Sequence, residues 1–198
     1  MTRAWLAAQL RGEALPAPRV DDAAAALERE GVAALLHELW QAQTPEQDDL
    51  AAWRHAAADQ TRTVAMRQLL QQSETRRIGA ALAAAGIECL WLKGAALSQW
   101  LYPKPHLRPS GDLDVLFASH ADALRAADVL APLGYRLPIR HIAGDLYVYE
   151  LLAVHAHHGL ELDLHWRLAN TALVSERLQW TELRAAAIAL PGLGEGAL

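Results

Sequence analysis

Apolar side chains in the N-terminal part of the chain recur at helical spacing. Between residues 50 and 82 the interval is mostly three or four, at Leu50, Trp53, Ala57, Val64, Leu69, Leu70, Ile78 and Leu82. This period predicts one long amphipathic helix, and Gly86 is a suitable stop for it. An alanine-rich run after Asp22 predicts an earlier helix that breaks or bends at Gly31, and Thr44 followed by Pro45 is typical of a helix start. Residues 1–86 are therefore predicted to form a helical segment.

The pattern changes at residue 87, where short apolar or alternating runs are separated by glycines and prolines. These runs predict strands at 87–92, 112–117, 135–142, 146–153 and 160–166, and helices at 94–101, 120–133 and 180–187. A loop with three prolines covers residues 102–111. The order β-α-β-α-β-β-β predicts a mixed-sheet domain of the α/β or α+β class over residues 87–198, preceded by the helical segment.

The composition fits a globular chain and narrows its partners. The chain has 198 residues, 21% of them charged, with a formal net charge of −5. A general nucleic-acid binder usually carries a strong basic excess, so the charge argues against long nucleic acid as a partner. Cys89 is the only cysteine, which excludes an intrachain disulfide. The N-terminal apolar run is too short for a secretory signal and no window reaches the length of a membrane span, so we expect a cytoplasmic protein without a membrane partner.

Asp112 and Asp114 are the most informative pair in the sequence. On a strand, residues i and i+2 point to the same face, roughly 6–7 Å apart, so both carboxylates would project side by side. Aspartate is disfavoured in strands, yet this run continues through Leu116 and Phe117 as a buried strand would. A divalent cation such as Mg²⁺ explains the pair, because it binds carboxylate oxygens together with substrate phosphates. The plainer alternative is that Asp112 caps the strand and Asp114 faces solvent.

A second predicted strand repeats this pattern. Glu161, Asp163 and His165 would share one face of it, with leucines on the other. If it lies beside residues 112–117, one of its acids completes a three-carboxylate site, and we select Asp163 as the central polar position. His165 either orients Asp163, contacts an acceptor substrate bound at this site, or is a buried, hydrogen-bonded histidine. An edge strand with a solvated face is the alternative. Carboxylates this crowded should have raised pKa values without a metal, so a metal-free Asp114→Asn variant is expected to be at least as stable as the wild type.

The turn after the first predicted strand carries Lys93, Gly94 and Ala95. A glycine there lets backbone N–H groups approach a phosphate, and a helix N-terminus favours anions. Lys93 and Lys104 are the only lysines among 18 basic residues, so Lys93 is a candidate for a compact, flexible charge on phosphate. Arg108, in the loop before Asp112, could also reach a triphosphate. An ordinary turn and a surface arginine are the alternatives.

Three motifs occur together in this part of the chain. They are Leu-Lys-Gly-Ala-Ala-Leu at 92–97, Leu-Arg-Pro-Ser-Gly-Asp-Leu-Asp-Val-Leu at 107–116 and Leu-Asp-Leu-His-Trp-Arg-Leu at 162–168, with Tyr102 between the first two. In this combination the chain resembles the uncharacterised bacterial nucleotidyltransferase family, a branch of the DNA polymerase β-like superfamily, over roughly residues 75–193. The resemblance implies an α+β fold with a polymerase β-like mixed sheet. It has a short helix after a glycine turn, a strand with two acids, and a third acid on a neighbouring strand.

The resemblance also implies an activity. It is the transfer of a nucleoside monophosphate from an NTP to an acceptor, with two Mg²⁺ ions. By position, Asp112 and Asp114 would hold both ions, Asp163 would bind the ion next to the attacking hydroxyl, and Gly94 with Ala95 would line the triphosphate. The acceptor stays open: a small hydroxyl or amino compound, a peptide, or a protein side chain.

Two other functions stay open. In the first, the same fold serves as a nucleotide-binding or protein-interaction module that has lost catalysis. The Gly-Ala turn favours it, since the superfamily usually has Gly-Ser or Gly-Gly there. The second is a metallohydrolase that uses His155, His157 and His158 with His141 and Asp145. Strand alternation opposes it, because it places His158 on the other face from His155 and His157.

Overall fold

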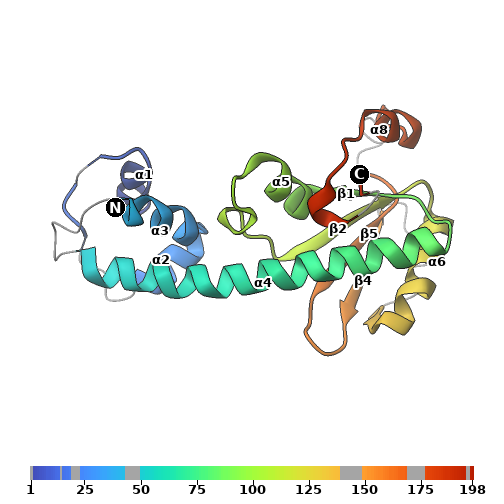
Figure 1. The fold of residues 1–198 in the computed structure, drawn as a ribbon, viewed down its shortest axis with the longest axis horizontal. Coiled ribbons are helices and arrows are strands. Elements are labelled where there is room, and N and C mark those ends of the chain that lie inside the picture. Colours follow the sequence, from blue (N-terminus) through green and yellow to red (C-terminus); the bar gives the residue numbers. More distant parts are fainter. Residues whose placement is uncertain are drawn as a thin grey trace. The chain divides into compact units, whose positions relative to one another are not determined.

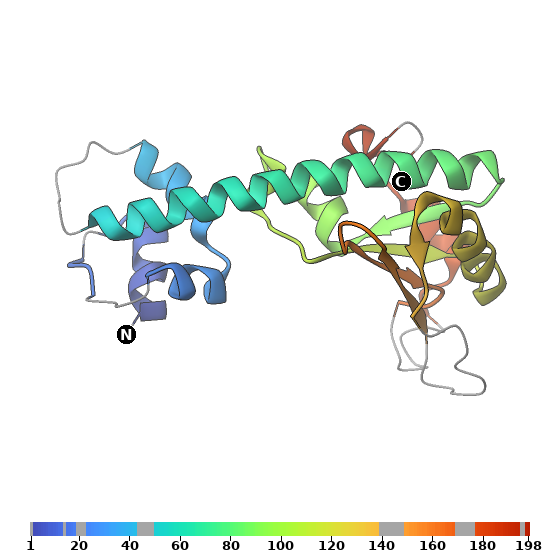
Figure 2. The ribbon, with the colours of Figure 1, turned by 90° about the horizontal axis from the view of Figure 1, so that it is seen from below.

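The structure is a computed structural model, and Figures 1 and 2 show its fold in two views. It describes residues 2–13, 15–18, 23–42, 50–138, 149–168, 177–194 and 197–198. The chain divides into two compact units, one built from Met1–Leu69 with Pro103–Pro109 and the other from Leu70–Tyr102 with Ser110–Leu198. The longest helix, α4 (Ala51–Ala84), contributes to both. Among the described residues, no helix is long and apolar enough to cross a membrane.

Short helices packed on tryptophans build the first unit, which we call the helical unit. It holds α1 (Thr2–Leu10), α2 (Ala23–Glu30), α3 (Ala33–Gln41), the first part of α4 and a 3₁₀ turn at Pro105–Leu107. In its core, the ring centroid of Trp5 lies 4.7 Å from that of Trp53 and 6.4 Å from that of Trp40. Gly31 follows α2 with a φ of 64°, which confirms the predicted break. The predicted helix start at Thr44 lies outside the described residues.

A five-stranded mixed sheet organises the second unit, which we call the sheet unit. Its strands are β1 (Cys89–Leu92), β2 (Asp112–Phe117), β3 (Tyr135–Arg136), β4 (Glu150–His155) and β5 (Glu161–His165). The spatial order is β1-β2-β5-β4-β3, with β2 and β5 parallel and the other neighbours antiparallel. Its helices are the last part of α4, α5 (Lys93–Leu101), α6 (His120–Leu130) and α8 (Trp180–Ala186), with 3₁₀ turns at Ala131–Leu133 and Pro191–Leu193. The predicted α+β class with a mixed sheet is confirmed.

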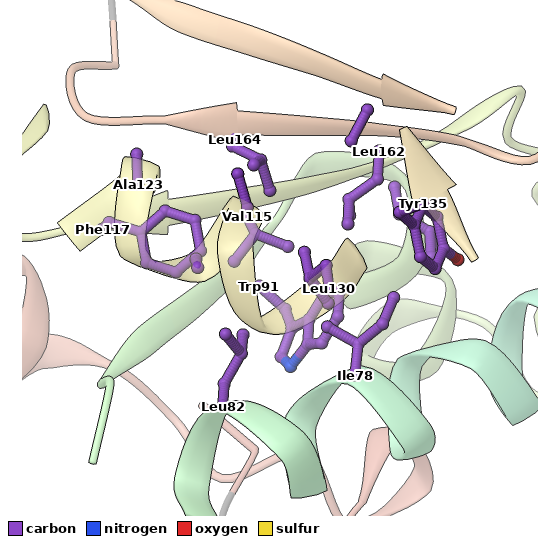
Figure 3. Packing of buried hydrophobic residues seen from close by; sticks show 14 of the residues in the cluster. Ile78, Leu82, Trp91, Val115, Phe117, Ala123, Leu130, Tyr135, Leu162 and Leu164 are labelled. Carbon is purple, nitrogen blue, oxygen red and sulfur yellow. The ribbon is translucent and has the colours of Figure 1, made fainter. Parts of the chain in front are cut away.

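One face of the sheet forms the hydrophobic core of this unit. Alternate residues of the two central strands are fully buried there: Leu113, Val115, Phe117, Leu162 and Leu164. They belong to one cluster with side chains of α4 and α6, including Ile78, Leu82, Ala123 and Leu130 (Figure 3). Because strand side chains alternate, Asp112, Asp114, Asp163 and His165 belong to the opposite face. The sheet therefore directs these polar residues away from α4 and α6.

Several element boundaries differ by one or two residues from the predicted ones, and three elements differ more in extent or type. Within the described residues, the strand predicted at 135–142 is only Tyr135–Arg136. The strand predicted at 146–153 begins, as far as it is described, at Glu150 and continues to His155, because alternate positions stay buried up to that histidine. The helix predicted at 120–133 becomes a 3₁₀ turn after Leu130, where Pro132 lacks the backbone N–H that an α-helix needs.

Candidate active site

Pairing across the two central strands places the acids that the sequence analysis selected. Asp114 lies opposite Asp163 in the parallel ladder of β2 and β5, and Asp112 lies two residues earlier on the same face. Antiparallel pairing of β4 with β5 then places Glu150 opposite His165. Three neighbouring strands thus contribute carboxylates and one imidazole to the sheet face that is turned away from α4 and α6.

Asp114 is the most buried of these acids, with a relative exposure of 3%. Its Oδ1 accepts a hydrogen bond from Lys93 Nζ at 2.7 Å and lies 3.0 Å from His165 Nε2. Burial by itself raises the pKa of the Asp114 carboxyl, but the contacts with His165 and Lys93 outweigh it and hold this pKa below its ordinary value. The raised pKa that the sequence analysis expected for Asp114 is therefore wrong, because two nitrogen groups compensate its charge.

Asp163 behaves in the opposite way. Burial, followed by the negative charge of Glu150, raises the pKa of the Asp163 carboxyl from 3.8 to about 6. Asp112 and Asp114 raise it further, and His165 lowers it. The crowding expected from the sequence thus raises the pKa of Asp163 on β5, whereas the pKa of Asp114 on β2 is lowered. A bound cation would remove much of this penalty, since an opposite charge nearby favours the ionised carboxylate.

His165 is buried between carboxylates, with a relative exposure of 2%. Besides the contact of Nε2 with Asp114, its Nδ1 lies 3.1 Å from Glu150 Oε2, although the angle is not that of a hydrogen bond. The ring also stacks on Tyr149, with the ring centroids 5.8 Å apart. The structure therefore places His165 against Asp114 and Glu150, where the sequence analysis left its role open.

A metal ion fits the donor set at this position. Asp114, Asp163 and His165 each offer one potential ligand atom, and these three atoms lie within 4.8 Å of one another. Carboxylate oxygens suit hard divalent cations and an imidazole nitrogen suits transition metals. The ammonium of Lys93 already contacts Asp114, which shows that the site accommodates a positive charge. Asp112 lies outside this compact group of three.

Asp112 is fixed at the start of β2 by neighbours that the sequence analysis did not select. The hydroxyl of Ser110 donates to the backbone oxygen of Asp112 at 2.9 Å and contacts its Oδ1 at 3.3 Å. The Nε2 of Gln71, on α4, donates to the backbone oxygens of Ser110 and Asp112 at 3.1 and 3.4 Å. The serine directly before a glycine-led strand was a readable signal, whereas the reach of Gln71 depends on long-range packing.

Lys93 begins α5 in an unusual backbone conformation. Its φ is 43°, and no other non-glycine residue in the described ranges has a positive φ. Leu92 precedes it as the N-cap residue and makes no side-chain capping bond, while Gly94 and Ala95 follow as buried residues of the first helical turn. Hydrogen bonding and charge from Asp114 raise the pKa of the Lys93 amine, against the lowering effect of burial, which is the largest single cause. Lys93 thus stays a cation, beside both the acids and a helix N-terminus.

Arg108 belongs to the other unit. It follows the 3₁₀ turn in the segment Pro103–Pro109, which clusters with the helical unit, and its backbone N–H donates to Pro105. The acids and Lys93 all belong to the sheet unit. The role of Arg108 on a triphosphate stays a prediction.

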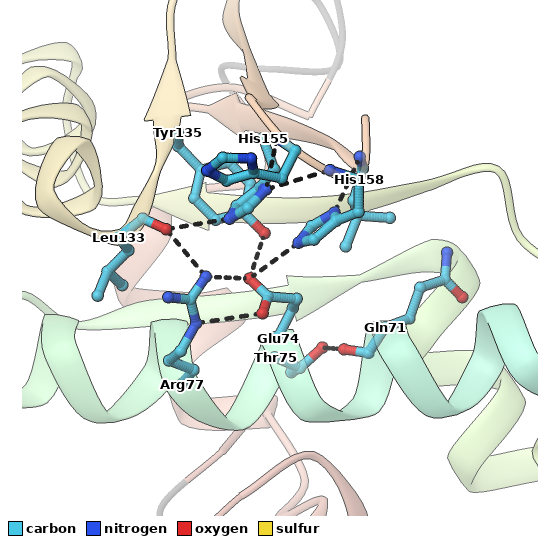
Figure 4. A network of polar contacts seen from close by, with 10 residues as sticks. Gln71, Glu74, Thr75, Arg77, Leu133, Tyr135, His155 and His158 are labelled. Atoms are coloured by element: carbon cyan, nitrogen blue, oxygen red, sulfur yellow. Dashed lines mark hydrogen bonds and ion pairs between the residues drawn. The ribbon is translucent and has the colours of Figure 1, made fainter.

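The histidines considered for a metallohydrolase form a separate network with α4 (Figure 4). His155 Nε2 lies 3.1 Å from the backbone oxygen of Leu133, and its Nδ1 accepts weak bonds from the backbone N–H groups of residues 157 and 158. Glu74 accepts two hydrogen bonds from Arg77 and one from the Tyr135 hydroxyl. Glu74, His155 and His158 each have a potential ligand atom within 4.8 Å of the others, but protein groups already engage all three, and the backbone N–H of Leu160 donates to His158 Nδ1. His141 and Asp145 lie outside the described residues.

The fold and this acidic face define an α+β protein with a donor set that could hold a divalent cation. Residues 16–193 match the model of a family described as uncharacterised nucleotidyltransferase. The chain belongs to this family, and nucleotidyl transfer from an NTP is the general reaction that the family assignment carries. No curated protein and no solved structure matches the chain.

Proposed function

We propose that the protein transfers a nucleoside monophosphate from an NTP to a hydroxyl or amino acceptor, with Mg²⁺ as the cofactor. The observation that carries the proposal is the parallel pairing of Asp114 with Asp163, with Lys93 Nζ 2.7 Å from Asp114 at the start of a helix. Acids for a cation and a helix N-terminus for a phosphate therefore share one place in the sheet unit. The family assignment supplies the reaction class.

In this proposal Asp112, Asp114 and Asp163 hold two Mg²⁺ ions that arrive with the NTP. Such ions, when bound, stabilise both the attacking and the leaving oxygen of an in-line displacement at the α-phosphorus. The acceptor oxygen or nitrogen bonds to that phosphorus as pyrophosphate leaves. The acids are held for this task by the strands: Asp114 and Asp163 as a ladder pair, and Asp112 by the bonds of Ser110.

Lys93, Gly94 and Ala95 would receive the triphosphate. The first turn of a helix directs backbone N–H groups and the positive end of the helix dipole toward an anion. Lys93 adds a charge that can move, since its side chain is 59% exposed although Nζ contacts Asp114. Arg108 is a further proposed phosphate contact. We propose a small molecule or a protein side chain as the acceptor, because the net charge of −5 disfavours long nucleic acid.

Position-specific radiolabel tests the reaction class while the acceptor is still unidentified. The full-length protein is incubated with Mg²⁺, a pool of cell metabolites or proteins, and an NTP labelled on either the α- or the γ-phosphate. Nucleotidyl transfer moves the α-label to an acceptor and releases the γ-label as pyrophosphate. Label from the γ-phosphate in the acceptor would instead indicate phosphoryl transfer and contradict the proposal.

Matched variants connect the label to the site. Asp114→Asn and Asp163→Asn each remove one charge from the proposed metal ligands and should abolish α-label transfer. Glu161→Gln removes an exposed charge from the same strand face and should keep it. If Asp163→Asn transfers label as fast as Glu161→Gln does, the proposed site is wrong.

The alternative function is a nucleotide-binding or protein-interaction module of the same fold without catalysis. One observation favours it: the ammonium of Lys93 occupies Asp114 as an internal counter-ion. In such a module Mg²⁺ and an NTP would stabilise the protein against heat by mass action, yet no α-label would reach any acceptor. Thermal melting with each of the four NTPs therefore separates binding from transfer.

A further inference from the structure

The buried imidazole of His165 lies between two carboxylates, one at each ring nitrogen. Asp114 Oδ1 is 3.0 Å from Nε2, and Glu150 Oε2 is 3.1 Å from Nδ1. The ring is rigidly placed, because its exposure is 2% and Tyr149 stacks on it. Asp163, two residues earlier on β5, completes a group of ligand atoms within 4.8 Å.

A neutral imidazole cannot satisfy both carboxylates. It carries one N–H, so one of its two nitrogens faces a carboxylate oxygen with its lone pair. If Nε2 bears the hydrogen, Nδ1 opposes Glu150; if Nδ1 bears it, Nε2 opposes Asp114. Either a second ring proton or a cation removes the conflict; with a cation between Nε2 and Asp114 Oδ1, both atoms donate electron pairs to it and Nδ1–H is directed at Glu150.

We propose that His165 binds the metal directly through Nε2, together with Asp114 and Asp163, and that this mixed donor set prefers a first-row transition ion such as Mn²⁺ to Mg²⁺. The inference rests on the proposed function and deepens it by naming a further ligand and the class of metal. The separation of 3.0 Å between Nε2 and Oδ1 fits adjacent ligands of an octahedral ion, since bonds of 2.0–2.1 Å, the length for Mg²⁺, place such ligands about 2.9 Å apart and slightly longer bonds place them further apart. Lys93 Nζ, on an exposed side chain, moves aside when the ion binds.

Glu150 then takes the place that metal-bound histidines usually give to a carboxylate. Such histidines donate their second N–H to a carboxylate or backbone oxygen, which fixes the tautomer and makes the ring a stronger ligand. Glu150 is the ladder partner of His165 and is 37% exposed, so a small turn of its side chain completes this bond. A nitrogen ligand favours transition ions because Mg²⁺ prefers oxygen ligands throughout.

The probe is the metal alone, added to the full-length protein after treatment with a chelator. Free Mn²⁺ is measured by its electron paramagnetic resonance signal, and Mg²⁺ is titrated as a competitor. Wild type should bind Mn²⁺ more tightly than Mg²⁺, because Mg²⁺ accepts a nitrogen ligand poorly. Electron spin echo modulation of bound Mn²⁺ should contain coupling to ¹⁴N from the imidazole, a signal that depends neither on catalysis nor on any variant.

Three variants test the assignment. His165→Gln keeps an amide that can donate to Asp114, and it should weaken Mn²⁺ binding about tenfold to a hundredfold, change Mg²⁺ binding far less and remove the ¹⁴N coupling. Glu150→Gln should weaken Mn²⁺ binding about tenfold. Glu161→Gln is the matched control on the same face and should leave both affinities unchanged.

Two results would overturn the proposal: wild-type Mn²⁺ without ¹⁴N coupling, or equal loss of Mn²⁺ and Mg²⁺ affinity in His165→Gln. Either would make His165 a hydrogen-bond donor that positions Asp114, as a neutral or protonated ring. Such a result would leave Mg²⁺-dependent α-label transfer intact, whereas the absence of that transfer would count against the proposed function alone.

Discussion

Replacing Asp163 by asparagine should make the metal-free protein more stable at neutral pH. Burial and the charge of Glu150 raise the pKa of Asp163 from 3.8 to about 6. A raised acid pKa means that the ionised form is disfavoured in the folded state. The stability associated with its protonated form is fully present below pH 3.8 and is lost as the pH rises through 6. The amide of the Asp163→Asn variant does not ionise, so the variant escapes this penalty.

The magnitude follows from the shift. About two pKa units at 1.36 kcal/mol each give a penalty of about 3 kcal/mol above pH 7, as an upper limit for a carboxyl that is half-buried. The amide does not reproduce the polar contacts of the carboxylate, which reduces the gain in stability of the variant. We therefore expect a gain of about 1–3 kcal/mol at pH 7.5, or a rise in Tm of roughly 3–10 °C. Near pH 4 the gain should be a small fraction of this, because folded Asp163 is already protonated there.

Calorimetry with a chelator at pH 4, 6 and 7.5 measures the difference between wild type and Asp163→Asn, and it resolves the two units if they melt separately. Groups that titrate equally in both proteins cancel in this difference. Glu161→Gln, on the same strand face, controls for the loss of a negative charge in general. A variant that is less stable than wild type at pH 7.5, or equally stabilised at pH 4 and 7.5, would refute the reasoning.

Three further predictions use the same measurements. Asp114→Asn should lower the stability of the metal-free protein by about 1–3 kcal/mol at pH 7.5, because Lys93 and His165 lose a charged partner. This change is opposite in sign to that of Asp163→Asn, and thermal melting that shows both variants stabilised or both destabilised would contradict it. Glu74→Gln should lower stability by about 1–3 kcal/mol in calorimetry and leave Mn²⁺ affinity unchanged. Burial, the largest single cause, raises the Glu74 pKa, but hydrogen bonds from Arg77 and the Tyr135 hydroxyl outweigh it and lower this pKa, so the loss of stability should become smaller as the pH falls. The Lys93→Gly variant should be more stable than Lys93→Ala by about 1 kcal/mol in thermal melting, because glycine adopts a φ of 43° without strain. Inside a helix alanine is usually the more stable residue, so that order would exclude strain at residue 93.

The alternation of polar and apolar residues was enough to predict much of the sheet, because it indicates within each strand which face is buried. In β2, polar and apolar residues alternate from Asp112 to Leu113 and Asp114, and the strand has the predicted bounds. In β5 the same alternation separates Asp163 and His165 from the leucines. Chemistry that depends on neighbours within one strand is therefore visible in the sequence.

Chemistry that depends on pairing between distant segments was not visible. Glu150 reaches His165 only because β4 pairs antiparallel with β5 in one register, and a shift by one residue would turn it to the other face. The sign of the Asp114 pKa shift depends on Lys93 and His165, which come from the turn after β1 and from β5. The sequence correctly predicted that crowded acids include one with a raised pKa. That Lys93 and His165 compensate the charge of Asp114, while the pKa of Asp163 stays raised, could be seen only in the three-dimensional arrangement.

The charge balance of this sheet face links its stability to its proposed chemistry. Lys93 compensates Asp114 and leaves Asp163 with a pKa near 6, so within the described residues the metal-free site is only partly neutralised. The ionised carboxylate of Asp163 therefore lowers the stability of the metal-free fold above about pH 6. A destabilising carboxylate opposite Asp114 is understandable if a cation is present during function, because the same crowding that costs stability without metal increases the affinity for a divalent ion. Lys93 fits the same explanation: its ammonium contacts Asp114 in the metal-free site, and in the proposed function a bound cation would take that position while Lys93 would contact the phosphates.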